Sequence, residues 1–294
     1  ALQRLAHFAR QSWGRTVLAV TGSTGKTTTR EILATLLARR YRVLKSERNY
    51  NNEFGLPLTL LRLQADTELA IVEMAMSHKG EIARLCAVAE PNVGLVTNVN
   101  PVHLEFFTSV DEIAVAKREL IQGLKNPAVA VLNADDERVR RFAQGFAGRV
   151  INFGFSPEAD VRAEAVNDQG CAGAEFDLVV GETRQRVQLA LTGRHNVANA
   201  LAAYAAASLF NIEPSVAAEV FPVLCPVALR GERIRFAESF TVINDAYNAN
   251  PRAVEMMTEA ISRTPGFRRR ILLIGEMREL GPAGPALHRQ TGAY

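Results

Sequence analysis

The stretch from Val20 to Thr29 reads VTGSTGKTTT and combines glycines, a lysine and hydroxyl side chains as a phosphate-binding loop does. An apolar run that indicates a buried strand ends here, and apolar residues at helical spacing follow. The backbone amides of a glycine-rich turn, together with the first turn of a helix, make a cradle for an anion. In such a loop Lys26 would reach the outer phosphates of a nucleotide, and the Thr27 hydroxyl would be a ligand for Mg²⁺. The alternative is an ordinary strand–turn–helix connection with a chance Gly-Lys-Thr, and the flanking elements favour the phosphate loop.

One position departs from the commonest phosphate-loop pattern. The pattern G-x-x-x-x-G-K-[ST] has a first glycine five residues before the second. The second glycine is Gly25 here, and the chain has Val20 where the first would stand. The stretch is therefore a damaged nucleotide site, a chance match, or a phosphate loop of a different kind.

Three further residues could take part in phosphate chemistry because of their place in the chain. Glu73 ends the apolar run LAIVE, where a carboxylate can hold a metal ion beside a phosphate loop or can be a solvated acid. His103 follows another apolar run through a short turn; a lone histidine is usually structural, but open α/β sheets bind ligands at this edge. Lys117 lies in the helical stretch EIAVAKREL, where the residues alone indicate a solvated lysine.

The elements that would position these residues alternate along the chain. Strands are expected at 68–74, 91–99, 128–136 and 149–155, with helices at 109–124 and 136–147. Such alternation predicts an α/β fold with a mainly parallel central sheet and helices on both faces. Residues 160–193 instead hold short alternating runs broken by Gly and Asn-Asp, which predict a small antiparallel patch. A strongly apolar helix is expected at 196–210.

A second alternation begins after Pro226 and Gly231. A strand is expected at 240–245, a helix from about Pro251 and another strand at 268–277. This order predicts the start of a second, Rossmann-like α/β domain.

The expected domains are therefore a central phosphate-loop domain over residues 17–228 and a truncated C-terminal domain over 229–294. Residues 1–16 are expected to be a connecting helix left from a further domain. Their basic, amphipathic sequence also fits a transit peptide.

The composition is that of an ordinary globular protein. The 294 residues are 48% hydrophobic and 22% charged, which allows one large or two ordinary domains with real cores. No apolar run approaches the ~20 residues of a membrane span. The net charge of +3 is too small to indicate nucleic-acid binding. Cys86, Cys171 and Cys225 lie far apart, which disfavours a disulfide framework or zinc site and fits a reducing compartment.

Taken together, the motifs resemble those of the Mur ligases, most closely the branch that adds D-alanyl-D-alanine to UDP-N-acetylmuramoyl-tripeptide. The resemblance covers nearly the whole chain, in the order TGSTGKTTT, NYNNEFGLPLTLL, EMAMSHKGEI, TNVNPVHLEFF, AVAKREL, LNADD, TGRHNVANALAA, DAYNANP and GEMRELG. Several of these motifs are general to Mur-type ligases. SHKGEI, DAYNANP and GEMRELG resemble motifs that are specific to this branch. The opening loop matches the shorter T-G-x-x-G-K-T form of these ligases, in which Gly22 takes the turn and the strand runs on through Val20.

The resemblance implies roles for residues around ATP. The phosphates would be bound by Gly22, Ser23, Thr24, Gly25, Lys26, Thr27 and Thr28. His195, Asn196 and Asn199 would surround the base. Arg230 and Asp245 would reach the phosphates or ribose from the C-terminal domain.

The resemblance also implies two Mg²⁺ ions and a path for the acyl substrate. Thr27 and Glu73 would hold one ion, and His103 and Lys117 the other. Lys117 would be a carbamate, which replaces a cation that repels Mg²⁺ with an oxygen ligand. Lys26, Glu73, His103 and Lys117 would be the catalytic residues. The UDP-sugar-peptide channel would be lined by Asn51, Asn52 and Gly55, with Tyr247, Asn248 and Asn250 on the opposite face of the cleft.

Three positions depart from the pattern of these ligases. Ala75 stands where the family often has glycine, Asn244 where it often has an acid before Asp245, and Ala253 where it often has serine. None removes an implied metal ligand. Asn244 loses a charge beside the nucleotide.

The implied activity is ATP-dependent amide formation through an acyl phosphate, in a monomeric enzyme of the bacterial cytoplasm without nucleic-acid partners. One alternative is another Mur-type ligase, such as a diamino-acid-adding, folate- or cyanophycin-type enzyme. A second is a P-loop NTPase without ligase activity, and a third is a fragment that binds ATP weakly and ligates nothing. The third residue of the tripeptide cannot be read from any motif.

Overall fold

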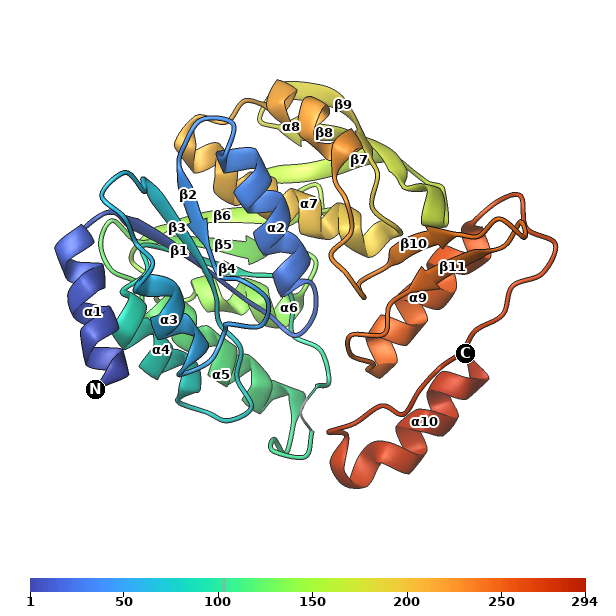
Figure 1. Ribbon diagram of the computed structural model, residues 1–294, viewed down its shortest axis with the longest axis horizontal. Coiled ribbons are helices and arrows are strands. Elements are labelled where there is room, and N and C mark those ends of the chain that lie inside the picture. The colour runs from blue at the N-terminus through green and yellow to red at the C-terminus, as the bar shows by residue number, and fades with distance from the viewer. Residues whose placement is uncertain (103) are drawn as a thin grey trace.

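The computed structural model describes residues 1–102 and 104–294, and one large sheet dominates it (Figure 1). Nine strands lie in the order β2-β3-β1-β4-β5-β6-β7-β8-β9. They are β1 Thr16–Thr21, β2 Val43–Lys45, β3 Leu69–Glu73, β4 Val93–Val96, β5 Val129–Asn133, β6 Arg149–Gly154, β7 Val161–Asp168, β8 Ala174–Val180 and β9 Thr183–Leu189. Neighbours from β2 to β7 are parallel, and β8 pairs antiparallel with both β7 and β9. The expected mainly parallel sheet and antiparallel patch are confirmed, and the patch extends the same sheet.

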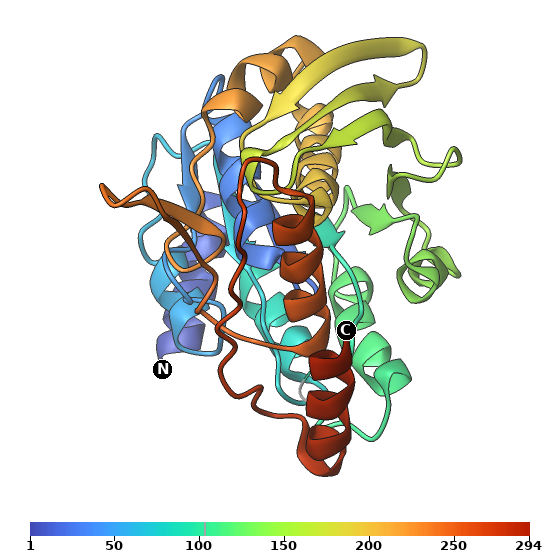
Figure 2. The same cartoon turned by 90° about the vertical axis from the view of Figure 1, so that its right-hand side faces the viewer.

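Helices cover both faces of this sheet, as Figures 1 and 2 show together. They are α1 Leu2–Trp13, α2 Lys26–Leu37, α3 Gly55–Leu60, α4 Glu81–Ala89, α5 Val110–Gln122, α6 Glu137–Arg140, α7 Arg194–Ala207 and α8 Pro214–Val220, with short 3-10 helices η1 Arg141–Ala143, η2 Gly170–Ala172, η3 Ser208–Phe210 and η4 Phe221–Val223. Helices α2, α7 and α8 contribute to one core cluster, and α1, α3, α4 and α5 contribute to another. Within the described residues, no helix has the length and apolar character needed to cross a membrane.

The two core clusters follow from the alternation of side chains in β1. Leu18 and Val20 belong to the cluster with α2 and α7, whereas Val17 and Ala19 belong to the cluster with α1 and α4. Successive side chains of a strand point to opposite faces, and a strand covered on both faces reads as a continuous apolar run. Strand β1, between β3 and β4, is such a strand. The loop that follows it therefore starts from a fixed point at the centre of the molecule.

Helix α1 is the helix expected within residues 1–16, and it packs against α3 and α4. Its Arg10 is buried and donates hydrogen bonds to the carbonyl oxygens of Ala89 (2.8 Å) and Glu90 (3.1 Å). The interpretation of this helix as a connection to a further domain stays a prediction.

The C-terminal part of the chain lies beside the sheet-bearing part, coloured orange to red in Figure 1. It contains β10 Glu232–Arg235, β11 Thr241–Asn244, α9 Pro251–Arg263, the 3-10 helix η5 Gly281–Ala283 and α10 Gly284–Ala293. Strands β10 and β11 form an antiparallel pair, and α9 contacts η2 and α7. The strand expected at 240–245 and the helix expected from Pro251 are thus β11 and α9.

The prediction of a strand at residues 268–277 is wrong. These residues have no helical or strand structure, and Ile271, Leu272, Leu273 and Ile274 are exposed. A strand needs a neighbour to pair its backbone groups. Among the described residues β11 pairs only with β10, and no strand pairs with 268–277. The apolar composition indicated a strand, but composition cannot supply its partner.

Candidate active site

The phosphate-type loop between β1 and α2 requires glycine at two positions. A Cβ on Gly22 would lie 1.9 Å from Thr97 Oγ1, and a Cβ on Gly25 would lie 2.2 Å from Asn199 Oδ1. Gly25 also has a φ of 82°, in the left-handed region that favours glycine. Because the strand runs through Val20 and turns at Gly22, glycine at position 20 is not needed for this path.

The loop is tied along its length to residues 97–100, which follow β4. Asn98 accepts from Ser23 N through its carbonyl oxygen and from Thr24 N through its side-chain oxygen, both at 2.9 Å. The Thr97 hydroxyl donates to Thr24 O at 2.6 Å, and Asn100 N donates to Ser23 Oγ at 2.8 Å. These hydrogen bonds fix the path of the loop against the segment that follows β4.

Lys26 begins α2 and turns its ammonium group back over the loop. Its Nζ donates to Gly22 O at 2.9 Å and Ser23 O at 3.2 Å. Burial lowers the pKa of Lys26, the charge of Glu73 opposes that shift, and the charge of Arg230 adds to it. A cation held at the mouth of a backbone cradle, with a nearby positive charge, favours an anionic ligand.

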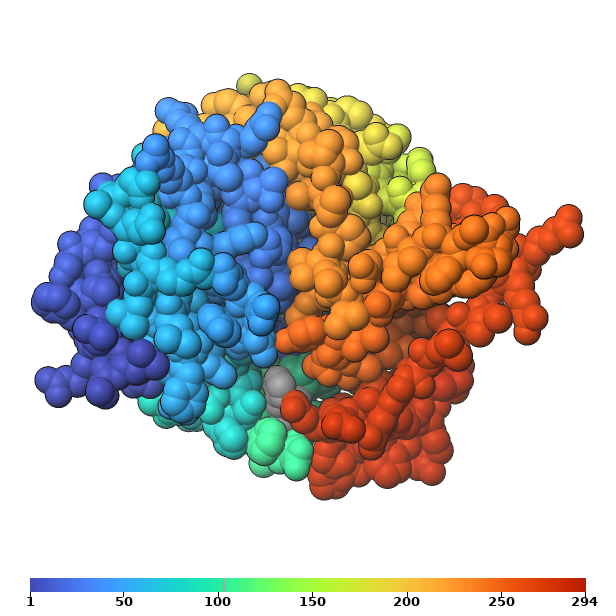
Figure 3. All heavy atoms as spheres, viewed as in Figure 1, coloured from blue at the N-terminus to red at the C-terminus, as the bar shows by residue number. Residues whose placement is uncertain are grey.

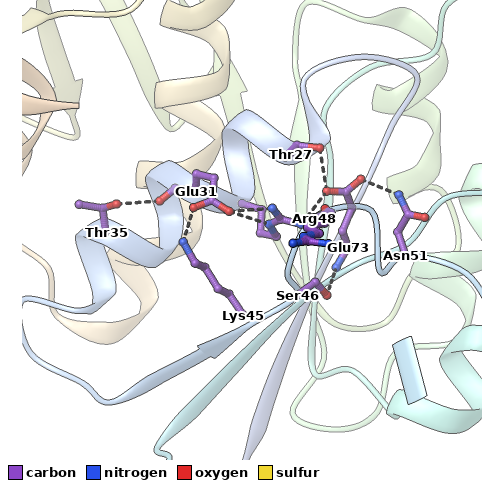
Figure 4. A network of polar contacts seen from close by, with 9 residues as sticks. Thr27, Glu31, Thr35, Lys45, Ser46, Arg48, Asn51 and Glu73 are labelled. Carbon is purple, nitrogen blue, oxygen red and sulfur yellow. Dashed lines mark hydrogen bonds and ion pairs between the residues drawn. The ribbon is translucent and has the colours of Figure 1, made fainter. Parts of the chain in front are cut away.

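Glu73 ends β3 and lies buried against the first turn of α2 (Figure 4). Its Oε2 accepts from Thr27 Oγ1 at 2.9 Å and from Arg30 Nη1 at 3.2 Å. Its Oε1 accepts from Asn51 Nδ2 at 2.9 Å. The two carboxylate oxygens thus face different parts of the chain, one facing the phosphate-type loop and the other facing the segment before α3.

The donor set at this point fits a Mg²⁺ ion whose other ligands come from a nucleotide and water. The Thr27 hydroxyl and the Glu73 carboxylate are hard oxygen ligands, and they lie within hydrogen-bond distance of one another. Mg²⁺ is usually bound by one or two carboxylates together with substrate phosphates. Among the described residues no group of three or more His, Cys, Asp or Glu side chains is arranged to hold a metal by itself.

The second predicted metal site is only partly described. His103 lies outside the described residues. Lys117, on α5, is 3% exposed, and burial, followed by the charge of Lys26, lowers its pKa well below the usual value. The interpretation of Lys117 as a solvated lysine is therefore wrong, and the side chain is a buried amine near Lys26.

A cleft of about 890 Å³ joins the loop to the C-terminal part of the chain. Figure 3 shows the C-terminal residues lying against the sheet-bearing part on one side of the molecule. The predicted site residues that line the cleft are Ser23, Thr24, Gly25, Lys26, Thr27, Thr28, Asn51, Glu73, His195, Asn196, Asn199, Arg230, Asp245, Tyr247, Asn248 and Asn250. Gly22, Asn52, Gly55 and Lys117 do not line it.

A smaller cavity of about 340 Å³ lies on the other side of Asn51. Asn51, Asn52 and Ala75 line it, with Gln3 and Arg84. Asn51 and Ala75 also line the larger cleft, so the two hollows meet there. Asn52 therefore lies beside this hollow, whereas Gly55 lines neither.

The start of α7 forms a polar wall of the cleft. Asn196 Nδ2 donates to Thr192 O at 2.8 Å, and Asn199 Nδ2 donates to Asn196 Oδ1 at 2.9 Å, which fixes both amides. Burial lowers the pKa of His195 to about 4, with smaller opposing effects from Asp168 and Glu259 and a supporting one from Arg252. His195 is therefore a neutral imidazole at pH 7, able to pack against an uncharged ring.

The facing wall comes from the segment around β11. The Arg230 guanidinium lies 3.9 Å from the centre of the Tyr247 ring, which holds it by a cation–π contact. Burial raises the pKa of Asp245 to about 6, while a hydrogen bond from Gly231 N and the charge of Arg230 oppose the shift. Asn244 Oδ1 accepts from Ala246 N at 3.3 Å, and Asn244 does not line the cleft.

Sequence reasoning missed three residues in or beside the cleft. Arg30 contacts Glu73 directly, and its signal was a charge among the apolar positions of α2. Asp135 and Asp136, in the segment LNADD, line the cleft but also organise backbone: Asp135 accepts from Phe155 N and Asp136 from Val99 N, both at 2.7 Å.

Comparisons with known proteins place this geometry in a family. The Mur ligase middle domain matches residues 20–207, and the Mur ligase, glutamate ligase domain matches residues 229–294. The UDP-N-acetylmuramoyl-tripeptide--D-alanyl-D-alanine ligase of Bacillus subtilis (strain 168) is 36% identical over 293 residues, covering 100% of this chain and 63% of that protein.

Solved structures agree. Crystal structure I of MurF from Acinetobacter baumannii has a TM-score of 0.93 at 28% identity, over 99% of this chain and 63% of that chain. MurF ligase from Thermotoga maritima in complex with ADP has a TM-score of 0.90 at 30% identity, over 99% of this chain and 67% of that chain. The chain thus spans 63% of the length of its Bacillus subtilis relative. It belongs to the Mur ligase family.

Proposed function

We propose that the protein joins D-alanyl-D-alanine to UDP-N-acetylmuramoyl-tripeptide at the expense of ATP, in the synthesis of peptidoglycan precursors. Relatives that carry this activity in their names match the chain over its whole length but are themselves longer. The activity is therefore inferred for the protein as a whole.

One observation carries the proposal: Glu73 is shared between the phosphate-type loop and the segment that holds Asn51. A ligase of this kind must bring a substrate carboxylate next to the terminal phosphate of ATP. A site whose metal-binding carboxylate contacts both the nucleotide loop and the wall of a second hollow supplies that arrangement. A P-loop NTPase without ligase activity has no use for the second contact.

The reaction proceeds in two steps. A carboxylate oxygen of the tripeptide attacks the γ-phosphorus, and the bond from the γ-phosphorus to the β–γ bridging oxygen breaks, giving an acyl phosphate and ADP. The amine of D-alanyl-D-alanine then attacks the acyl carbon. The tetrahedral intermediate collapses to an amide, releasing inorganic phosphate and a proton.

The residues of this chain contribute mainly position and charge. Amides of the loop and Lys26 hold the β- and γ-phosphates, and Thr27 and Glu73 supply the oxygen ligands of a metal ion. Mg²⁺, when bound, neutralises charge that would otherwise repel the attacking carboxylate. Arg230 and Asp245 approach from the C-terminal side and help to exclude water, which would hydrolyse the acyl phosphate.

Lys117 is proposed to become a carbamate that serves a second Mg²⁺ ion together with His103. The lowered pKa of Lys117 supports this, because only a neutral amine adds to CO₂. The addition forms an N–C bond and releases one proton, which turns the neutral buried amine into a carboxylate-type oxygen ligand.

We propose that the protein acts in the bacterial cytoplasm. A monomer remains the expectation. Among other Mur-type ligases, diamino-acid-adding, folate- and cyanophycin-type enzymes share the chemistry but differ in the amine, so the amine is the quantity to test.

The experiment is phosphate release from ATP with Mg²⁺, UDP-N-acetylmuramoyl-tripeptide and one of several amines. We expect release that needs the tripeptide and is completed by D-alanyl-D-alanine, and not by a diamino acid or glutamate. Lys26→Ala and Glu73→Ala should each lower it at least about 10²-fold. Phosphate release without the tripeptide, or activity unchanged in both variants, would contradict the proposal.

A further inference from the structure

Arg30 is a buried arginine one turn beyond Thr27 on α2, with an exposed fraction of 2%. Its guanidinium donates hydrogen bonds to Glu31, Arg48 and Glu73, which are labelled in Figure 4. Nε and Nη2 donate to Glu31 Oε1 at 3.1 and 2.7 Å. Nη1 donates to Glu73 Oε2 at 3.2 Å and to Arg48 O at 3.1 Å. One planar group thus connects a helix, a strand end and a loop.

These contacts hold Arg48 in an unfavourable backbone conformation. Arg48 has a φ of 48°, in the left-handed region that residues other than glycine rarely adopt. Such a conformation persists where surrounding contacts fix it. The hydrogen bond from Arg30 to the Arg48 carbonyl is one such contact, and Arg48 leads directly into the segment that carries Asn51.

Asn51 completes a second connection to the same carboxylate. Its Nδ2 donates to Glu73 Oε1, and its carbonyl oxygen accepts from Ala75 N at 2.9 Å. Glu73 is therefore fixed by three side chains: Thr27 and Arg30 from α2, and Asn51 from the wall of the second hollow. Of the three, only Arg30 brings a positive charge. It is also the one that contacts both the Glu73 carboxylate and the backbone at Arg48.

We propose that Arg30 is a positioning residue. It fixes the Glu73 carboxylate at the angle needed to meet a metal ion beside Thr27, and it holds the Asn51 segment in register with that carboxylate. This inference rests on the proposed function, because that function makes Glu73 a metal ligand. Partners that orient a ligating carboxylate typically change metal affinity by 10–100-fold when they are removed.

The alternative is that Arg30 only neutralises a buried acid and fills space. The two accounts differ for Arg30→Lys. Lysine keeps the positive charge and most of the packing, but it is a point donor and cannot reproduce the planar fork that serves Glu31, Arg48 and Glu73 together. Positioning predicts that Arg30→Lys is impaired, whereas simple neutralisation predicts that it resembles the wild type.

The experiment measures Mn²⁺ binding to the ADP complex by electron paramagnetic resonance, for wild type, Arg30→Lys and Arg30→Met. ADP binding in the presence of EDTA is measured in parallel. Arg39→Met is the matched control. Arg39 lies just after the end of the same helix, and its guanidinium forms an exposed ion pair with Glu219 at 2.7 Å.

We expect Mn²⁺ affinity to fall at least about tenfold in Arg30→Lys, and further in Arg30→Met, with metal-free ADP binding and the Arg39→Met control within about twofold of wild type. Wild-type Mn²⁺ affinity in Arg30→Lys would overturn the proposal. If Arg30→Met does not fold, Arg30→Lys decides alone. Failure of the proposed function is a separate outcome: the wild type would bind Mn²⁺ and ADP but release no phosphate with the tripeptide.

Discussion

Asn199 Oδ1 occupies the space into which any side chain on Gly25 would extend. A Cβ at Gly25 would lie 2.2 Å from that oxygen, whereas normal contacts between such atoms begin beyond 3 Å. The amide that excludes it is itself fixed by Asn196. The shape of the phosphate-type loop is therefore set in part by α7, which comes far later in the chain.

Replacing Gly25 tests this relationship. We expect Gly25→Ala to lower the free energy of unfolding by about 1–3 kcal/mol and to abolish ADP binding, because the loop must move off Asn199. Urea denaturation and calorimetric titration with ADP measure the two effects. Gly145→Ala is the control, since Gly145 has a similar φ of 74° but open space around its Cβ position. Equal losses in both variants would mean that backbone strain, not the collision, is responsible.

Removing the ammonium of Lys26 should weaken nucleotide binding without unfolding the chain. Lys26 is a half-buried residue, and burial lowers the pKa of its ammonium group, so folding gains little from its charge. Lys26→Met should reduce phosphate release about 10²–10³-fold, the usual cost of losing one donor that stabilises developing charge. Lys125→Met, at an exposed lysine, is the comparison, and both variants should melt within a few degrees of wild type. A Lys26→Met variant with wild-type turnover would remove Lys26 from the site.

The raised pKa of the Asp245 carboxyl predicts how the free energy of unfolding changes with pH. Its pKa is raised to about 6 from 3.8, so the folded chain retains a proton that the unfolded chain loses. The stability contributed by this group is full below about pH 4 and is lost as the pH rises through about 6. The free energy of unfolding of the wild type should therefore fall relative to Asp245→Asn between those values. Urea titrations of both proteins at several pH values measure the difference, and parallel curves would contradict the raised pKa.

Thr264 holds the end of α9 against η2. Its hydroxyl accepts from Cys171 N at 2.8 Å and donates to Ala260 O at 2.7 Å, and the residue is 6% exposed. Thr264→Val keeps the shape but leaves Cys171 N without its acceptor, which should cost about 1–3 kcal/mol. Thr264→Ser keeps the hydroxyl and should retain most of the stability. Thermal melting ranks the variants, and a Ser variant as unstable as the Val variant would show that the methyl group matters as much as the hydroxyl.

The three thiols should react in a fixed order. Cys225 is exposed, whereas Cys86 and Cys171 are buried. Burial, with a smaller effect of Glu119, raises the pKa of Cys86 to about 12, so almost no thiolate forms at pH 8. A disulfide reagent at pH 8 should modify Cys225 quickly and the other two only after unfolding. Cys225→Ser should remove the fast phase, and a fast phase that persists would place a second thiol at the surface.

Local patterns in the sequence carried much of the fold and the centre of the site. The strand, glycine turn and helix around Lys26 lie within one short stretch, and Glu73 could be located because it ends an apolar run. Arg30 could not be found in this way, because its partners Arg48 and Glu73 lie 18 and 43 residues away and meet it only in the folded chain.

The burial of Lys117 was missed for the same reason. Its own helix has charged neighbours and gives no sign that the amine faces the interior near Lys26. The prediction of a strand at 268–277 is the opposite kind of error, because it expects an element that is not formed. The composition is that of a strand, but pairing depends on another segment. Contacts between distant parts of the chain decide all three cases.

The exposed segment from Ile271 to Ile274 has a consequence that we expect in concentrated solution. Leu273 is 95% exposed, and four adjacent aliphatic residues without a charge form a short β-prone sequence. Segments of this kind can pair with identical segments of other molecules and begin aggregation. Arg268, Arg269 and Arg270 stand directly before it, and stacking of like segments would bring these charges together, so we expect them to oppose it. We therefore expect the solubility of this chain to depend on the three arginines that precede this segment.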